Sequence, residues 1–241
     1  RAPLNSSVSL HKGSFVATML SIGLVVSLGG PLLFVLATKR FSLNSLSVPG
    51  RLVLWVLAAA TFVIAAYGGG VWLARIGVKP FGWVDLASTI VAIIAMLVGA
   101  IALQILVAKL GFKDKGDLKL QQKIYSLSVQ RRFFIVITAA VTEEVLYRGY
   151  AIGIGQEVLG NLTIAFVLSL LVFVVAHFTH GAKALAGILW ISFVMSLLFV
   201  VTGNLFACIL AHFVVDALGT LFVPWAASRK RARAALPVSE G

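Results

Sequence analysis

The sequence has few charged residues and almost no cysteine. Only 12% of its 241 residues are charged, whereas 60% are hydrophobic, and the mean hydropathy is +1.04. A soluble globular domain carries roughly 25% charged and about 45–50% apolar residues, so this composition indicates that lipid is the solvent. The single cysteine, Cys208, lies inside an apolar run and excludes a framework of intramolecular disulfides.

Acidic residues are also scarce. Eight Asp and Glu stand against 20 Lys and Arg, which gives a net charge of +12. In a soluble protein such a charge would favour nucleic-acid binding. Here the basic residues lie between apolar runs, so we interpret them as anchors of membrane spans at the cytoplasmic face and expect no nucleic-acid partner.

Long apolar runs divide the chain into candidate membrane spans, each of which needs about 20 mostly apolar residues. We therefore predict an all-α fold, a polytopic bundle of transmembrane helices, as a single membrane domain over 1–241. About seven spans are expected, and counts of six to eight fit the same sequence. The spans are 13–37, 52–74, 85–108, 132–154, 161–180, 184–202 and 204–225. Pro31 is expected to bend or break the first span.

The distribution of basic residues predicts the orientation of these spans. With seven spans, fourteen of the 20 Lys and Arg fall in 38–51, 109–131, 181–183 and the C-terminal tail, all on one side, and Arg132 at that edge of the fourth span makes fifteen. An excess of basic residues marks cytoplasmic loops. We therefore predict a multi-pass protein of a prokaryotic inner membrane, with the C-terminus cytoplasmic and the N-terminus outside. The segment 111–131 is expected to form an interfacial helix or loop, and 226–241 a basic cytoplasmic tail.

Ionisable side chains inside the predicted spans gather in the fourth, fifth and seventh. An ionisable group at the bilayer centre costs at least about 2.5–3.5 kcal/mol on insertion scales. Such a group persists where it pairs, faces a cavity or takes part in chemistry. The set consists of Glu143, Glu144, Arg148, His177, His212 and Asp216.

The spacing of these residues predicts which of them interact. Glu144 and Arg148 are four residues apart, so they share a helix face and can pair. Glu143 lies about 100° around the same helix, so its carboxylate points elsewhere. His212 and Asp216 are also four apart, which lets the carboxylate orient the imidazole. From the directions of the spans and their rise of about 1.5 Å per residue, the whole set can meet in the cytoplasmic half of the membrane.

Three motifs on these spans resemble a known family. The motifs are 142–149 (TEEVLYRG), 173–177 (FVVAH) and 212–216 (HFVVD). In this order they are similar to the EExxxR, FxxxH and HxxxN/D motifs of the CAAX-protease and bacteriocin-processing (CPBP/Abi) membrane peptidases. The resemblance covers about 120–225, which we interpret as the core that carries the motifs. Residues 1–110 match only in being helical and apolar.

The resemblance implies a glutamate-dependent intramembrane endopeptidase that needs no bound metal. By position, Glu143 and His177 would activate the attacking water, His212 and Asp216 would stabilise the oxyanion, and Glu144 would complete the catalytic set. Asp216 departs from the asparagine of the eukaryotic enzymes. Because an ionised carboxylate repels an oxyanion, we expect Asp216 to orient His212 or to be protonated. The implied partners are membrane lipids and a hydrophobic peptide or lipid-modified protein substrate, prenylated or CAAX-like.

The sequence also allows three other hypotheses about function. The predicted cofactor is none, yet Glu143, His177, His212 and Asp216 are all chemically able to bind zinc, although the sequence has no HExxH motif. Intramembrane Glu and His would equally suit a transporter or proton relay, but no internal repeat supports one. The same pairs could also serve helix packing alone, as in a scaffold or immunity protein with a degenerate site.

Overall fold

A computed structural model of the chain describes residues 6–41, 44–68, 73–111, 116–226 and 229. Within these ranges every regular element is a helix, and no strand occurs. The all-α fold is therefore confirmed. The elements are α1 (Ser6–Arg40), α2 (Val48–Val63), η1 (Ile64–Gly68), η2 (Leu73–Ile76), α3 (Trp83–Lys109), α4 (Gly116–Tyr125), α5 (Val129–Glu143), η3 (Glu144–Ile154), α6 (Gly155–Val158), α7 (Leu162–Ala176), η4 (Phe178–His180), α8 (Ala182–Thr202), α9 (Leu205–Ala217) and η5 (Leu218–Phe222).

Five of the described helices are long and apolar enough to cross a membrane. They are Gly13–Arg40, Val48–Ala66, Trp83–Lys109, Ala184–Thr202 and Leu205–Ala226, which match the first, second, third, sixth and seventh predicted spans. The fifth predicted span is the shorter apolar helix α7. The fourth is the continuous helix formed by α5, η3 and α6, whose apolar character is interrupted by charged side chains. The multi-pass architecture is thus supported, while the count of seven stays a prediction.

The first helix continues through Pro31, so it is not broken there. The helix α1 runs without interruption from Ser6 to Arg40. A proline removes one backbone donor, and lipid-buried helices tolerate this where neighbouring segments pack against them. Here α2, η3 and α7 all pack against α1. The tail predicted over 226–241 lies almost entirely outside the described residues.

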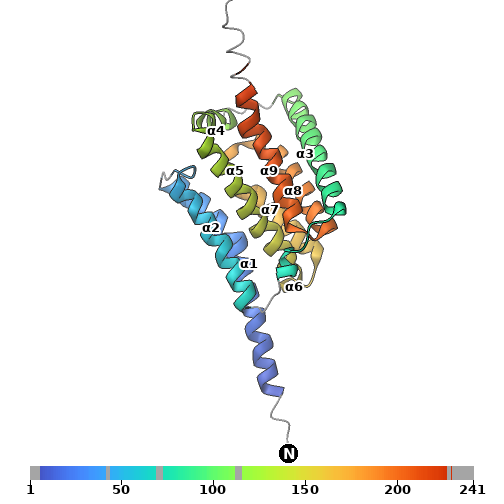
Figure 1. Cartoon of the computed structure of the whole chain (residues 1–241). Coiled ribbons are helices and arrows are strands. Elements are labelled where there is room, and N and C mark those ends of the chain that lie inside the picture. Colours follow the sequence, from blue (N-terminus) through green and yellow to red (C-terminus); the bar gives the residue numbers. More distant parts are fainter. Residues whose placement is uncertain (1–5, 42–43, 69–72, 112–115, 227–228, 230–241) are drawn as a thin grey trace, which may run out of the picture.

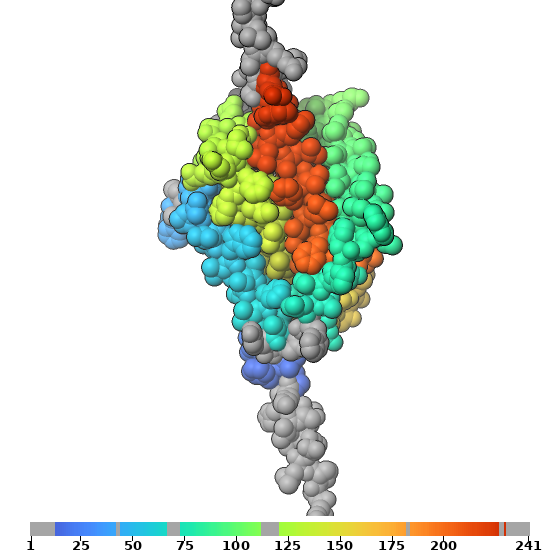
Figure 2. Space-filling view, viewed as in Figure 1, coloured from blue at the N-terminus to red at the C-terminus, as the bar shows by residue number. Residues whose placement is uncertain are grey.

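The π-helical segment η3 is the centre of the bundle. It contacts α1, α2, α5, α7, α8 and α9, and every one of its residues except Val145 is buried. Figure 1 shows α2, α5, α9 and α3 arranged across one face, with α7 and α8 behind them. In Figure 2 the side chains of these front helices close that face.

The outer surface of the bundle is apolar, as a lipid environment requires. On α3 the side chains of Val91, Ile94, Val98 and Ile101 are all more than half exposed. A contiguous apolar surface of this kind would be a liability in water. It supports contact of α3 with lipid along most of its length.

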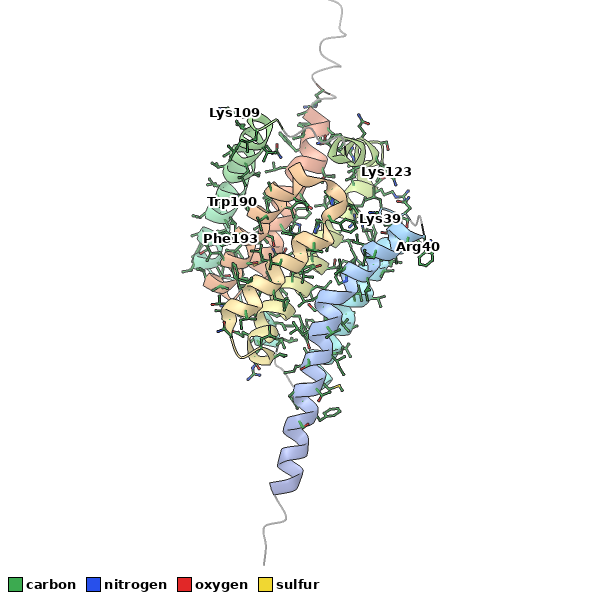
Figure 3. The ribbon with its side chains drawn as sticks, turned by 180° about the vertical axis from the view of Figure 1, so that it is seen from behind. Lys39, Arg40, Lys109, Lys123, Trp190 and Phe193 are labelled. Atoms are coloured by element: carbon green, nitrogen blue, oxygen red, sulfur yellow. The ribbon has the colours of Figure 1, made fainter. Side chains whose placement is uncertain are left out.

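The basic residues that the structure describes support the predicted grouping by side. Figure 3 labels Lys39, Arg40, Lys109 and Lys123, and all four lie in the half of the molecule away from the N-terminal end of α1. The predicted interfacial segment contains the helix α4, and the hydroxyl of Tyr125 at its end donates to the Gly219 carbonyl at 3.0 Å. That this side is cytoplasmic stays a prediction.

Glycines let the short helix η2 lie directly against η3. A Cβ at Gly153 would come within 2.6 Å of the Arg75 carbonyl oxygen, and one at Gly149 within 3.0 Å of the Ile76 carbonyl oxygen. After η2, Gly77 has a φ of 84°, and its carbonyl accepts from the Leu205 N–H at 2.8 Å. A positive φ of this size favours glycine. The start of α9 is therefore tied to the turn after η2.

We predict that Gly153→Ala destabilises the fold. The added methyl meets backbone rather than a flexible side chain, and overpacking of this kind costs about 1–3 kcal/mol. The matched control is Gly187→Ala in α8, where an added Cβ has no atom within 4 Å and the helix gains up to about 1 kcal/mol of propensity. Thermal unfolding in detergent should show a lower melting temperature for the first variant alone; equal melting temperatures would contradict the close approach.

Candidate active site

Side chains from all three motifs line one cavity of about 510 Å³. Glu143 at the end of α5, His177 at the end of α7, and His212 with Asp216 on α9 all contribute to its wall. Most of the remaining lining is apolar and comes from several helices. It includes Phe34, Val35, Leu54, Ile135, Val136, Ile188 and Ile191. The predicted convergence of the motif residues is confirmed.

The two adjacent glutamates face different surroundings, as their spacing predicts. Glu143 is half-buried and lines the cavity, whereas Glu144 is fully buried behind it. The Glu144 carboxylate accepts from Arg148 Nη1 at 3.0 Å, so the predicted ion pair is confirmed. Arg148 Nη2 also donates to the Ser192 hydroxyl at 2.9 Å. The pair therefore joins η3 to α8.

His212 lies between two carboxylates. Its Nδ1 is 2.7 Å from Glu144 Oε1, and its Nε2 is 3.5 Å from Asp216 Oδ2. An ionised Glu144 carboxylate can only accept, so Nδ1 of His212 carries the proton of the shorter contact. Nε2 lies within ion-pair range of Asp216, beyond ordinary hydrogen-bond distance. The expected contact between Asp216 and His212 is present.

His177 is held in one tautomer by the end of its own helix. Its Nδ1 is 2.8 Å from the Phe173 carbonyl oxygen, which can only accept. Nδ1 therefore carries the proton, and Nε2 of the neutral ring is an acceptor. The 15 residues of α7 rise about 22 Å, short of the roughly 30 Å hydrocarbon core. Non-helical backbone at membrane depth is tolerated where it lines a cavity, which is where His177 lies.

The ring of Phe173 connects the first and second motifs. Its centroid is 4.4 Å from that of His177 and 4.9 Å from that of Tyr147, which meets it edge-on. The guanidinium of Arg148 lies 4.9 Å from the same centroid. Such aromatic and cation–π contacts each contribute of the order of 1 kcal/mol. The conformation of His177 is thus coupled to the segment that carries both glutamates.

Several residues of the site have no signal in the motifs. Ser192 is one of many small polar residues in apolar helices, and nothing in its spacing marks it as the partner of Arg148. Lys39 and Arg51 also line the cavity. The sequence predicts that cations flank the spans. It does not predict that the end of α1 and the start of α2 lie against this cavity, because that placement depends on tertiary packing. Helices α1 and α2 therefore belong to the site, although no motif reaches them.

The donor set does not form a ready metal centre. Among the described residues, no group of three or more His, Cys, Asp or Glu side chains is arranged to hold a metal ion. Glu144 and His212 are instead occupied with each other and with Arg148 and Asp216. The absence of a cofactor stays a prediction.

Comparison with known proteins agrees with this geometry. Residues 126–218 match the family model described as type II CAAX prenyl endopeptidase Rce1-like. Over this segment the chain is similar to the Rce1-like family. The matched range includes Glu143, His177 and Asp216, and it confirms the resemblance drawn from the three motifs.

One curated relative extends the comparison. The Bacillus subtilis (strain 168) protein YpbD, itself described as uncharacterized, is 34% identical over 108 residues. The alignment covers 44% of this chain and 51% of YpbD, so the chain spans about half the length of that relative. No solved structure matches the chain significantly.

We predict that Arg148→Met destabilises the fold far more than the same change at an exposed ion pair. Removing one partner of a buried pair costs about 3–5 kcal/mol because a charge is left uncompensated. The control, Arg75→Met, breaks an exposed pair with Glu157 at 2.9 Å, for which about 1 kcal/mol or less is expected. Denaturant titration in micelles measures both free energies of unfolding. Equal losses would show that Arg148 does not neutralise Glu144.

Proposed function

We propose that this protein is an intramembrane endopeptidase of the Rce1-like kind, which hydrolyses a peptide bond in a hydrophobic or lipid-modified substrate. The observation that carries the proposal is the common cavity. Glu143 and His177 come from different helices and from different motifs, yet both line it. The Rce1-like match of residues 126–218 supports the reaction class. An ion-pair network that served packing alone would leave the position of His177 unexplained.

The two side chains are suited to hold and activate one water molecule. Glu143 offers carboxylate oxygens, and His177 offers Nε2 because its Nδ1–H is engaged by Phe173. A water that donates one proton to each acceptor has its lone pair directed away from both. Positioned general bases of this kind contribute about 10²–10⁴-fold in rate. Glu144 is bound to Arg148 and His212, so Glu143 is the available base.

The reaction follows from this arrangement. The water oxygen forms a bond to the scissile carbonyl carbon, its proton passes to Glu143, and the carbonyl π electrons move to the oxygen. Collapse of the tetrahedral intermediate re-forms the carbonyl and breaks the carbon–nitrogen bond. The proton on Glu143 passes to the leaving nitrogen. The products are a carboxylic acid and an amine, and the enzyme returns to its starting state.

The lining of the cavity indicates the substrate class. Its mostly apolar wall suits an apolar side chain or a lipid group, and its volume is within the range of about 300–1,000 Å³ usual for ligand sites. Two cations, Lys39 and Arg51, also line it. They favour a peptide that carries a negative charge near the scissile bond. A prenylated or otherwise hydrophobic CAAX-like C-terminal peptide has both properties.

We predict that Glu143→Gln and His177→Ala each lower the rate of cleavage by about 10²–10⁴-fold. The assay uses purified protein in nanodiscs and a panel of fluorescent farnesylated and unmodified hydrophobic peptides. Mass spectrometry identifies the new termini. The matched control, Glu157→Gln, alters a glutamate whose partner is the exposed Arg75, and it should cleave at the wild-type rate.

Two outcomes would overturn this assignment. Wild-type protein that cleaves no peptide of the panel would refute the endopeptidase. Full activity in the Glu143→Gln variant would refute the choice of base. Ion-driven uptake by the same protein in proteoliposomes would instead favour a transporter.

We predict that cleavage does not depend on a bound metal. The motif side chains are engaged with one another rather than grouped as metal ligands, within the part of the chain that the structure describes. Activity should persist after prolonged dialysis against a strong chelator, with elemental analysis showing far less than one zinc per chain. Stoichiometric zinc that is lost together with activity, and restored with it, would establish a metalloprotease.

A further inference from the structure

One arginine in the cavity wall has no hydrogen-bond acceptor for its guanidinium. Arg51 lies in the first turn of α2 and lines the cavity. Its Nε is enclosed by protein without a partner. Its two terminal nitrogens also make no hydrogen bond or ion pair with the part of the chain that the structure describes, and they are not among the enclosed atoms. They are therefore accessible donors that the protein leaves unused.

The surroundings of Arg51 place its charge beside the reacting groups. The guanidinium interacts electrostatically with Glu143 and with Asp216, which come from α5 and α9 and also line the cavity. Neither carboxylate forms an ion pair with Arg51. The cation thus lies near the proposed base without being bound to it, and its direct contacts stay open to a ligand.

The second cation of the lining is differently placed. Lys39 is exposed, and its Nζ lies 4.8 Å from the ring centroid of Phe178. An exposed ammonium is screened by water and salt. Arg51 is half-buried, and its planar guanidinium matches a carboxylate through two parallel hydrogen bonds. Of the two cations, Arg51 is the better suited to hold a carboxylate in one orientation.

The lining of the cavity indicates which carboxylate this is. A mostly apolar wall with one unpaired guanidinium suits a ligand that is apolar along its length and anionic at its end. A hydrophobic peptide with a free α-carboxylate has this form, whatever its side chains. An extended residue spans about 3.5 Å. A carboxylate bound at Arg51 would therefore leave the scissile carbonyl, at Glu143, only a few residues away.

We propose that Arg51 is a specificity-determining residue, whose guanidinium binds the free C-terminal carboxylate of the substrate peptide. The position of the cleaved bond is then set by its distance from the end of the peptide. This inference rests on the proposed endopeptidase activity and deepens it. Arg51 lies outside residues 126–218, which match the family model, so the inference assigns a role in recognition to α2.

The test removes the charge from each partner in turn. A peptide that the wild type cleaves is compared with the same peptide as its C-terminal amide. The wild type should favour the free acid by about 10–100-fold in kcat/KM, as expected for hydrogen bonds to a charged group. Arg51→Met should cleave both forms equally. The loss for the acid should appear in KM, because the contact is the same in the ground and transition states.

The matched control is another arginine at the start of a helix. Arg131 lies in the first turn of α5 and also has an enclosed Nε without a partner, but it lines a separate groove outside the cavity. Arg131→Met should keep the full preference of the wild type for the acid. Arg51→Lys retains the charge without the planar fork, so it should keep part of that preference.

The outcomes distinguish this inference from the activity on which it rests. Wild-type protein that cleaves acid and amide equally well overturns the role of Arg51 and leaves the endopeptidase standing, whether or not any variant is stable. An Arg51→Met variant that still prefers the acid, or that loses kcat equally on both peptides, also overturns it. The second result would show that Arg51 acts through Glu143. Wild-type protein that cleaves nothing overturns both proposals.

Discussion

The buried carboxylate of Glu144 is the interaction on which the rest of the site depends. It accepts from Arg148 on its own helix at 3.0 Å and lies 2.7 Å from His212 on α9. Burying one of these charged side chains without a partner would cost much free energy. Each charged side chain of the cluster therefore lowers the free-energy cost of burying its neighbours. Because Arg148 also donates to Ser192, the cluster joins η3, α8 and α9. The other glutamate, Glu143, is thereby free to face the cavity.

The dense packing around η3 explains how that cluster is enclosed. Serines from two neighbouring helices donate to its backbone: Ser27 to the Leu146 carbonyl at 2.5 Å and Ser169 to the Tyr147 carbonyl at 2.7 Å. Glycines on another side admit the backbone of η2. In lipid, small residues and polar contacts of this kind are what hold helices together. The glutamate and arginine of the first motif thus lie on a segment that is buried along nearly its whole length.

The cavity depends on a helix that stops early. Helix α7 ends at Ala176, and His177 satisfies the Phe173 carbonyl that the missing next turn leaves free. The same contact selects the tautomer of the histidine. The contact between His177 and the Phe173 carbonyl therefore lies at the end of the helix, in the wall of the cavity, and leaves Nε2 of the neutral ring as an acceptor for water.

The sequence by itself determined the all-α membrane architecture, because apolar run length is dictated by the hydrocarbon thickness. It also determined the pairs Glu144–Arg148 and His212–Asp216, since residues four apart share one helix face. The family followed from three ordered motifs. These features are local, so a linear pattern encodes them.

Only the tertiary structure decided which partners come from elsewhere in the chain. Ser192 as the partner of Arg148 and Arg51 as a cation in the cavity have no periodic signal. The unbroken course of α1 through Pro31 is of the same kind, because it depends on the packing of α2, η3 and α7 around the helix. Contacts between distant segments arise from how helices pack, and packing depends on the shapes of all the side chains together. The chain places its ionisable groups on three helices, but the fold alone makes them one site.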